Sequence, residues 1–97
     1  MSSGAQVVVV GAAWCQPCKA LKPVLDQLLT ETPVDAQIVH YDVDDDEEQC
    51  DQLNIVSVPT LLFLVSGTER LRNVGLTGVP DFVAKCRAHL ELDKAFA

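Results

Sequence analysis

The fold is decided by a short stretch of the sequence, WCQPC at Trp14–Cys18, which joins an apolar run to a long helical pattern. The run, Gln6–Val10, is almost entirely valine, as expected of a central strand that is buried on both faces. Cys15 therefore lies where a strand gives way to a helix, whose unpaired N–H groups and dipole favour a thiolate. Cys18 follows one turn later, close enough to form a disulfide with it. The stretch predicts thiol–disulfide chemistry, with metal binding as the second interpretation.

Length and composition bound the kind of protein. Ninety-seven residues, 48% of them hydrophobic, predict one domain, 1–97, whose tails 1–5 and 93–97 are expected to fray. Fourteen acidic residues against seven basic ones give a net charge of −7, which argues against binding to nucleic acid or to an anionic membrane. No apolar stretch is long enough to span a membrane, and the N-terminus lacks the basic region of a signal peptide. We therefore expect a soluble, monomeric, cytoplasmic protein.

Periodicity predicts the element order β-α-β-α-β-β-α. A strand, a crossover helix and a second strand make a right-handed βαβ unit, which a hairpin and a last helix complete. Pro23 lies inside the first helical pattern and is expected to kink it. The strands are expected at Gln6–Val10, Ala36–Val43, Leu61–Val65 and Glu69–Gly75, and the helices at Gln16–Thr30, Asp44–Leu53 and from Pro80 onward.

Several motifs follow one another in the spacing of a known family. WCQPCK at Trp14–Lys19 is followed by Pro23, then by Val58-Pro59-Thr60, and then by a strand that ends at Gly75. Together they resemble the thioredoxin family, from about Val7 to Leu90. The resemblance implies an α/β domain with a minimal thioredoxin fold. Its four-stranded mixed sheet would have the order 2-1-3-4, with helices on both faces, and would lack the strand and helix with which the family usually begins.

The resemblance also implies roles for individual residues. Cys15 would be the nucleophile, more exposed and more acidic than the resolving thiol Cys18, and the two would form the redox disulfide. Pro59 would be cis and would lie against both cysteines. The residues implied to support the active site are Trp14, Gln16, Pro17, Lys19 and Pro59. Those implied to form an apolar substrate-binding surface are Trp14, Val58, Pro59, Val74, Gly75 and Leu76.

The same resemblance implies a thiol–disulfide oxidoreductase that reduces protein disulfides. Electrons would enter and leave as thiols, so no bound cofactor is expected. The implied partners are disulfide-containing proteins and a reductase, by family analogy an NADPH-linked one.

Three residues depart from the family pattern. Val9 stands where typical thioredoxins carry a buried aspartate, and His40 where they carry the lysine that accompanies it. Because that pair assists proton transfer to the buried cysteine, its loss predicts slower resolution of the mixed disulfide. Gln16 replaces the usual glycine, which leaves the redox potential open.

Two other functions remain as alternatives. A glutathione-dependent, glutaredoxin-like reductase would normally have Pro-Tyr between its cysteines and a Gly-Gly and acidic pair where this chain has Val74–Gly78. A non-catalytic module that binds a partner or bridges a metal would use Cys15 without turnover.

The remaining cysteines and acids are assigned structural roles. Cys50 and Cys86 are expected on helices that cover opposite faces of the sheet, as small core residues, so no metal site is predicted. The acidic run Asp42–Asp51 has Glu47 where a calcium loop needs glycine, and it is expected to be a solvated helix start that can attract a basic partner. Of the two histidines, His40 is expected to be half-buried and His89 exposed.

Overall fold

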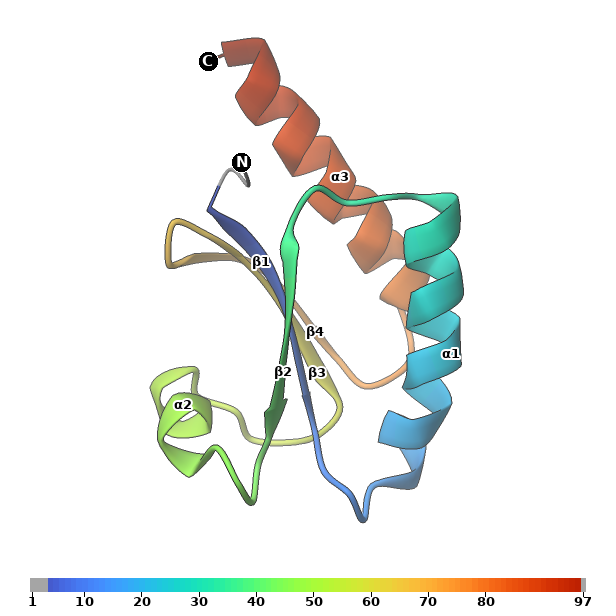
Figure 1. Ribbon diagram of the computed structural model, residues 1–97, viewed down its shortest axis with the longest axis vertical. Helices are drawn as coiled ribbons and strands as arrows, with labels where there is room; N and C mark the ends of the chain where they lie inside the picture. The colour runs from blue at the N-terminus through green and yellow to red at the C-terminus, as the bar shows by residue number, and fades with distance from the viewer. Residues whose placement is uncertain (1–3, 97) are drawn as a thin grey trace.

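The computed structural model describes residues 4–96, with side chains as far as residue 92. Seven elements follow one another in the predicted order β-α-β-α-β-β-α (Figure 1). Their bounds are β1 Ala5–Gly11, α1 Gln16–Glu31, β2 Gln37–Asp42, α2 Glu47–Gln52, β3 Thr60–Val65, β4 Thr68–Val74 and α3 Val79–Phe96.

The four strands form one mixed sheet in the order β2-β1-β3-β4, which confirms the predicted topology. β1 runs parallel to β2 and antiparallel to β3, which in turn pairs antiparallel with β4. The two central strands are therefore flanked by strands on both sides. This position explains why they are the two continuous apolar runs of the sequence.

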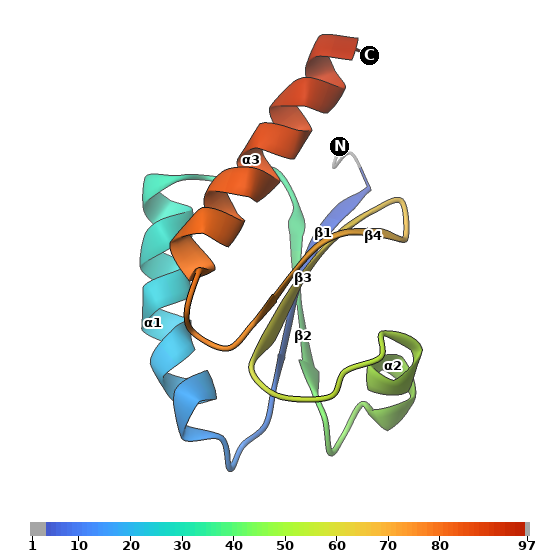
Figure 2. The same ribbon diagram turned by 180° about the vertical axis from the view of Figure 1, so that it is seen from behind.

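Helices cover the two faces of the sheet unequally (Figures 1 and 2). α1 and α3 lie on one face and the six-residue α2 lies on the other. The larger core packs Leu21 and Leu25 of α1 and Cys86 of α3 around Phe63 of β3. The smaller core contains Cys50 of α2. As predicted, the two free cysteines lie on opposite faces of the sheet.

α2 is shorter than the sequence predicts and begins at Glu47 instead of Asp44. Two carboxylates hold the preceding residues in a turn, because Asp44 N–H donates to Asp42 Oδ1 at 2.8 Å and Asp42 N–H donates to Asp46 Oδ2 at 2.9 Å. Aspartate side chains bonded to nearby backbone N–H groups in this way compete with helix formation. The turn fixes the acidic residues at the end of β2.

Both ends of the chain are more regular than the expected frayed tails. Ala5 belongs to β1 and pairs with Val65, and α3 continues beyond Leu92 to Phe96. Residues 1–3 and 97 lie outside the described part of the chain.

Pro23 lies inside α1, as predicted. None of the helices in residues 4–96 has the length and apolar character to cross a membrane.

Candidate active site

Cys15 occupies the residue that caps the N-terminus of α1. Its backbone is extended, with φ −91° and ψ 110°, and its Sγ accepts a hydrogen bond from Cys18 N–H at 3.2 Å. Pro17 lies in the first turn, where its missing N–H costs no helical hydrogen bond. A sulfur that accepts from the helix N-terminus is stabilised as the thiolate. This contact favours charge on Cys15.

A disulfide joins Cys15 to Cys18, and their Cα atoms are 5.3 Å apart. The other two cysteines, Cys50 and Cys86, are free and buried. The structure therefore pairs the two cysteines of the WCQPC stretch with each other.

The expected difference in exposure between the two cysteines is wrong. Cys15 is only 4% exposed, whereas Cys18 is half-buried. Cys15 is held inward because its N–H donates to Ala12 O at 3.1 Å and its sulfur faces the Cys18 N–H. Cys18 lines an open cavity between α1 and the sheet. The resolving position is therefore the one with access to solvent in the disulfide form.

Pro59 lies beside this pair and links it to the end of β4. The Val58–Pro59 peptide bond is cis, as the resemblance implies. Pro59 O accepts the N–H of Gly75 at 2.8 Å, and Gly75 has a φ of +85°, a conformation that favours glycine. The chain thus turns away from β4 directly beside Pro59, which also lines the cavity with Cys18.

On one side of the disulfide the surface is apolar. Trp14 is 66% exposed, and its Nε1–H donates to Asp44 Oδ2 at 2.9 Å. Val56, which the sequence did not single out, is 91% exposed. We call this surface the docking groove; its volume is about 480 Å³, and its lining residues are Trp14, Val43, Ile55, Val56, Ser57 and Val58.

The remaining residues of the implied substrate surface lie outside the docking groove. Val74 and Leu76 are 52% and 43% exposed, whereas Pro59 is buried. Of the residues implied to support the site, Gln16 and Lys19 are exposed in the first turns of α1. The structure brings Trp14 and Val58 together in one groove, and it joins Gly75 to Pro59 by a hydrogen bond.

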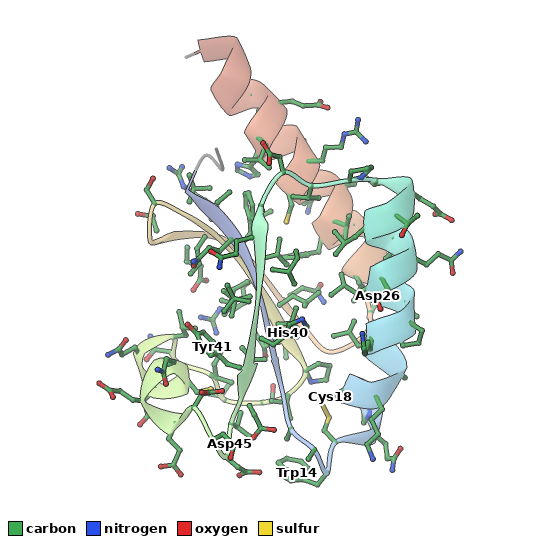
Figure 3. The ribbon with its side chains drawn as sticks, viewed as in Figure 1. Trp14, Cys18, Asp26, His40, Tyr41 and Asp45 are labelled. Atoms are coloured by element: carbon green, nitrogen blue, oxygen red, sulfur yellow. A yellow bond between two sulfur atoms is a disulfide. The ribbon has the colours of Figure 1, made fainter. Side chains whose placement is uncertain are left out.

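On the other side of the disulfide a second cavity, of about 380 Å³, lies between α1 and β2. We call it the cysteine cavity. In Figure 3 the labelled side chains of Cys18, Asp26 and His40 lie on this side of β2, and Tyr41 and Asp45 lie toward α2. Its floor is apolar, with Val9, Leu21 and Leu25, and its polar lining side chains include Lys22, Asp26, His40, Asp42 and Asp46.

The two histidines reverse their expected exposure. His40 is exposed, because β2 is an edge strand of the sheet. His89 is half-buried, with its ring centroid 6.1 Å from that of Phe63. Of the two, only His40 shares a cavity with a cysteine.

The free cysteines lie away from both surfaces and are held as thiols. Burial raises the pKa of Cys86 to about 12. Burial also raises the pKa of Cys50, with smaller contributions from the charges of Asp46, Asp51 and Asp42. A protonated thiol is a poor nucleophile, so neither free cysteine is suited to attack a disulfide.

The chain is similar to known thioredoxins. The sequence model of the family described as Thioredoxin matches residues 1–87. A thioredoxin of Chlamydia muridarum is 36% identical over 89 residues, which are 92% of this chain and 86% of that one. A thioredoxin of Mycobacterium tuberculosis is 38% identical over 79 residues, 80% of this chain and 68% of that one. The X-ray structure of Fasciola hepatica thioredoxin superposes with a TM-score of 0.75 at 28% identity, covering 87% of this chain and 82% of that one.

Proposed function

The chain belongs to the thioredoxin family and is a thiol–disulfide oxidoreductase with a Cys15–Cys18 redox pair, and we propose that Cys15 attacks first and Cys18 second. The observation that carries this order is the hydrogen bond from Cys18 N–H to Cys15 Sγ at the start of α1. It stabilises negative charge on Cys15, and Cys18 accepts no equivalent bond among the described residues. The helix N-terminus acts on the same atom.

The proposed reaction has two exchange steps. The thiolate of Cys15 attacks one sulfur of a substrate disulfide, forming a mixed disulfide and releasing the first substrate thiolate. Cys18 then loses its proton and attacks Cys15 Sγ, which forms the Cys15–Cys18 bond and breaks the bond to the substrate. The substrate gains two electrons, and the two cysteines lose them. The product of this cycle is the disulfide form seen here.

Protein disulfides are the substrates that fit this surface. The docking groove presents the exposed side chains of Trp14 and Val56 next to the redox pair. Burying the apolar surface of either side chain against a substrate segment stabilises the complex. We propose that Val58 takes part in this contact within the groove and that Pro59, Val74, Gly75 and Leu76 extend it beyond the groove.

Charge adds a preference for basic partners. No Lys or Arg occurs between Lys22 and Arg70, whereas seven acidic residues occur between Asp42 and Asp51. Asp44 is one of them and bonds directly to Trp14. A substrate or reductase with positive charge beside its cysteine would be attracted to this rim, with a rate that falls as salt rises.

We propose that the reaction uses no bound cofactor and that a reductase, NADPH-linked as the family implies, returns electrons to the pair. The protein would act as a monomer in a reducing compartment, the cytoplasm. The free thiols Cys50 and Cys86 support this location, because unpaired cysteines persist where disulfides are kept reduced.

Reduction of insulin with dithiothreitol as electron donor tests this function. The parent protein should accelerate insulin precipitation, and Cys15→Ser should lose that acceleration. Cys50→Ser is the matched control, because it removes a buried thiol outside the redox pair, and it should retain turnover. Full turnover in Cys15→Ser would contradict the proposal.

A further inference from the structure

The second exchange step requires a proton acceptor near Cys18. Cys18 attacks as the thiolate, so its proton must leave before or during the formation of the Cys15–Cys18 bond. The β1 residue that faces it cannot accept the proton, because Val9 is apolar and lines the same cavity. The acceptor therefore has to come from the other walls of the cysteine cavity.

His40 and Cys18 line the same cavity, with the end of β1 between them. A Cβ added to Gly11 would be 3.4 Å from Cys18 Sγ, so the end of β1 touches this side chain. Two residues earlier in β1, Val9 pairs with His40 of β2. Two strand residues span about 7 Å along β1, and neighbouring strands lie about 4.8 Å apart, so Cys18 and His40 are too far apart for a direct hydrogen bond. Since each water takes up about 30 Å³ of liquid, a cavity of about 380 Å³ has room for the waters that bridge such a distance.

The carboxylates and the ammonium of the cavity already have partners, and the side chain of Tyr41, which also lines it, lies toward α2 (Figure 3). Asp26 forms an ion pair with Lys22 at 3.1 Å. Asp46 accepts the N–H of Asp42, and Asp42 Oδ1 accepts the N–H of Asp44. Within the described part of the chain, the imidazole of His40 has no hydrogen bond or ion pair. Histidine is also the side chain that most readily accepts and returns a proton near neutral pH.

We propose that His40 is the proton acceptor for Cys18 in the second exchange step, acting through water in the cysteine cavity. This inference rests on the proposed order of attack by Cys15 and Cys18. The Cys18 S–H proton passes to the imidazole as Cys18 Sγ bonds to Cys15 Sγ. The substrate sulfur leaves as a thiolate, and the imidazolium releases its proton to solvent or to that thiolate. Electrons and protons balance without a further reactant.

Several elements place titratable side chains in the cavity with His40. Lys22 and Asp26 face the cavity from α1, Asp42 from β2 and Asp46 from the turn before α2. Asp42 is the rival acceptor, since it lies on the same strand and pairs with Gly11.

A coloured aromatic disulfide separates the two steps in a stopped-flow experiment. Reduced protein releases one coloured thiolate when Cys15 attacks, at a rate that depends on reagent concentration. It releases the second when Cys18 closes the disulfide, at a rate that does not. Both phases are measured across the neutral pH range for the parent, His40→Ala, His40→Gln, Asp42→Asn and the control Ile38→Ala. Ile38 lies two residues before His40 on the same edge strand and is 38% exposed.

We expect His40→Ala and His40→Gln to slow the second phase about tenfold or more and to flatten its pH profile, with the first phase unchanged. Added imidazole should restore the second phase of His40→Ala, because the shortened side chain leaves space for it. Ile38→Ala should behave as the parent, with and without imidazole.

The proposal is wrong if both His40 variants keep the parent's second phase, or if they slow it without changing the pH profile and without imidazole rescue. It is also wrong if Asp42→Asn alone reproduces the loss. Loss of the first phase in the parent would instead contradict the proposed order of attack. His40→Gln keeps a polar side chain on the strand, so a folding failure of His40→Ala leaves the test intact.

Discussion

The docking groove and the cysteine cavity lie on opposite sides of one disulfide, and they differ in the side chains that line them. The groove is apolar, belongs to the face of the sheet covered by α2, and displays Trp14 and Val56 to solvent. The cavity is rimmed by charged and polar side chains, lies between α1 and β2, and reaches Cys18. The difference fits the two roles proposed above, in which one surface binds the substrate and the other accepts the proton.

This division follows from how the sheet is covered. α1 leans against β1 and β3 through Leu21 and Leu25, but its Lys22 and Asp26 reach the open rim beside the edge strand β2. On the other face the short α2 leaves the segment Ile55–Val58 uncovered. The cysteine cavity is thus open where α1 does not cover β2, and the docking groove is open where α2 does not cover the loop Ile55–Val58.

The largest effect that separates the two surfaces is expected from Trp14→Ala. Removing the exposed indole should lower kcat/KM for insulin about tenfold or more, because much of its apolar surface would be buried against a protein substrate. The rate with a small aromatic disulfide should change little. Val24→Ala is the control, since Val24 is 46% exposed on α1 outside the groove. Equal losses with both substrates would show that Trp14 acts on chemistry and not on docking.

A smaller effect is expected from Asp44→Ala. The variant removes the 2.9 Å hydrogen bond to Trp14 Nε1 and leaves the indole itself in place. A hydrogen bond to a charged group contributes about 1.5–3 kcal/mol at most, and solvent exposure reduces that here. We expect kcat/KM for insulin to fall severalfold. We also expect the fluorescence anisotropy of Trp14 to fall, because the indole is held less firmly. Asp45→Ala, the neighbouring exposed carboxylate, should leave both measurements unchanged, and an equal loss there would point to charge instead of the bond.

Val9→Asp changes the cavity and not the groove. A carboxylate beside Cys18 adds a second proton acceptor, so the second phase of the stopped-flow trace should accelerate modestly in the parent and more in His40→Ala. Placing a carboxylate at this half-buried position should also lower the free energy of unfolding by about 1–3 kcal/mol. Val9→Asn is the uncharged control, and an acceleration there as well would show that polarity alone, without proton transfer, changes the rate.

The smallest effect is expected at the thiols that touch neither surface. Because burial raises the pKa of Cys86 to about 12, iodoacetamide at pH 8 should alkylate the reduced Cys15–Cys18 pair and leave Cys86 intact in a mass spectrum. The unfolded chain ionises this thiol near its ordinary pKa, about 8.5. Stability should therefore be unaffected below about pH 8.5 and should fall as the pH rises toward 12. Cys86→Ala should remove that alkaline decline, and rapid alkylation of Cys86 at pH 8 would contradict its assignment.

The sequence predicted the elements and their order because each carries a local signal. The valine run of β1, the helical leucine spacing of α1 and the turn at Ser66–Gly67 all depend on neighbouring residues. α2 was predicted to begin three residues too early, because the turn that delays it depends on hydrogen bonds between aspartate carboxylates and the backbone. Nothing in composition or spacing distinguishes those aspartates from helix-start residues.

Only those site residues that belong to a sequence motif could be predicted. Cys15, Cys18 and Pro59 stand in recognisable sequence positions. The bond from Trp14 to Asp44 joins residues 30 positions apart, and Val56 looks like any other apolar residue in a loop. The reversed exposure of Cys15 and Cys18 depends on the cavity between α1 and β2, which only the packed structure defines.

Trapping the mixed disulfide tests the central claim most directly. Cys18→Ser, which cannot close the internal disulfide, should accumulate a covalent adduct with a disulfide-containing substrate, and peptide mapping should locate the substrate on Cys15. Cys15→Ser should form no such adduct under the same conditions. An adduct on Cys18 in Cys15→Ser, formed as fast as the one on Cys15, would show that Cys18 can attack first and would contradict the account.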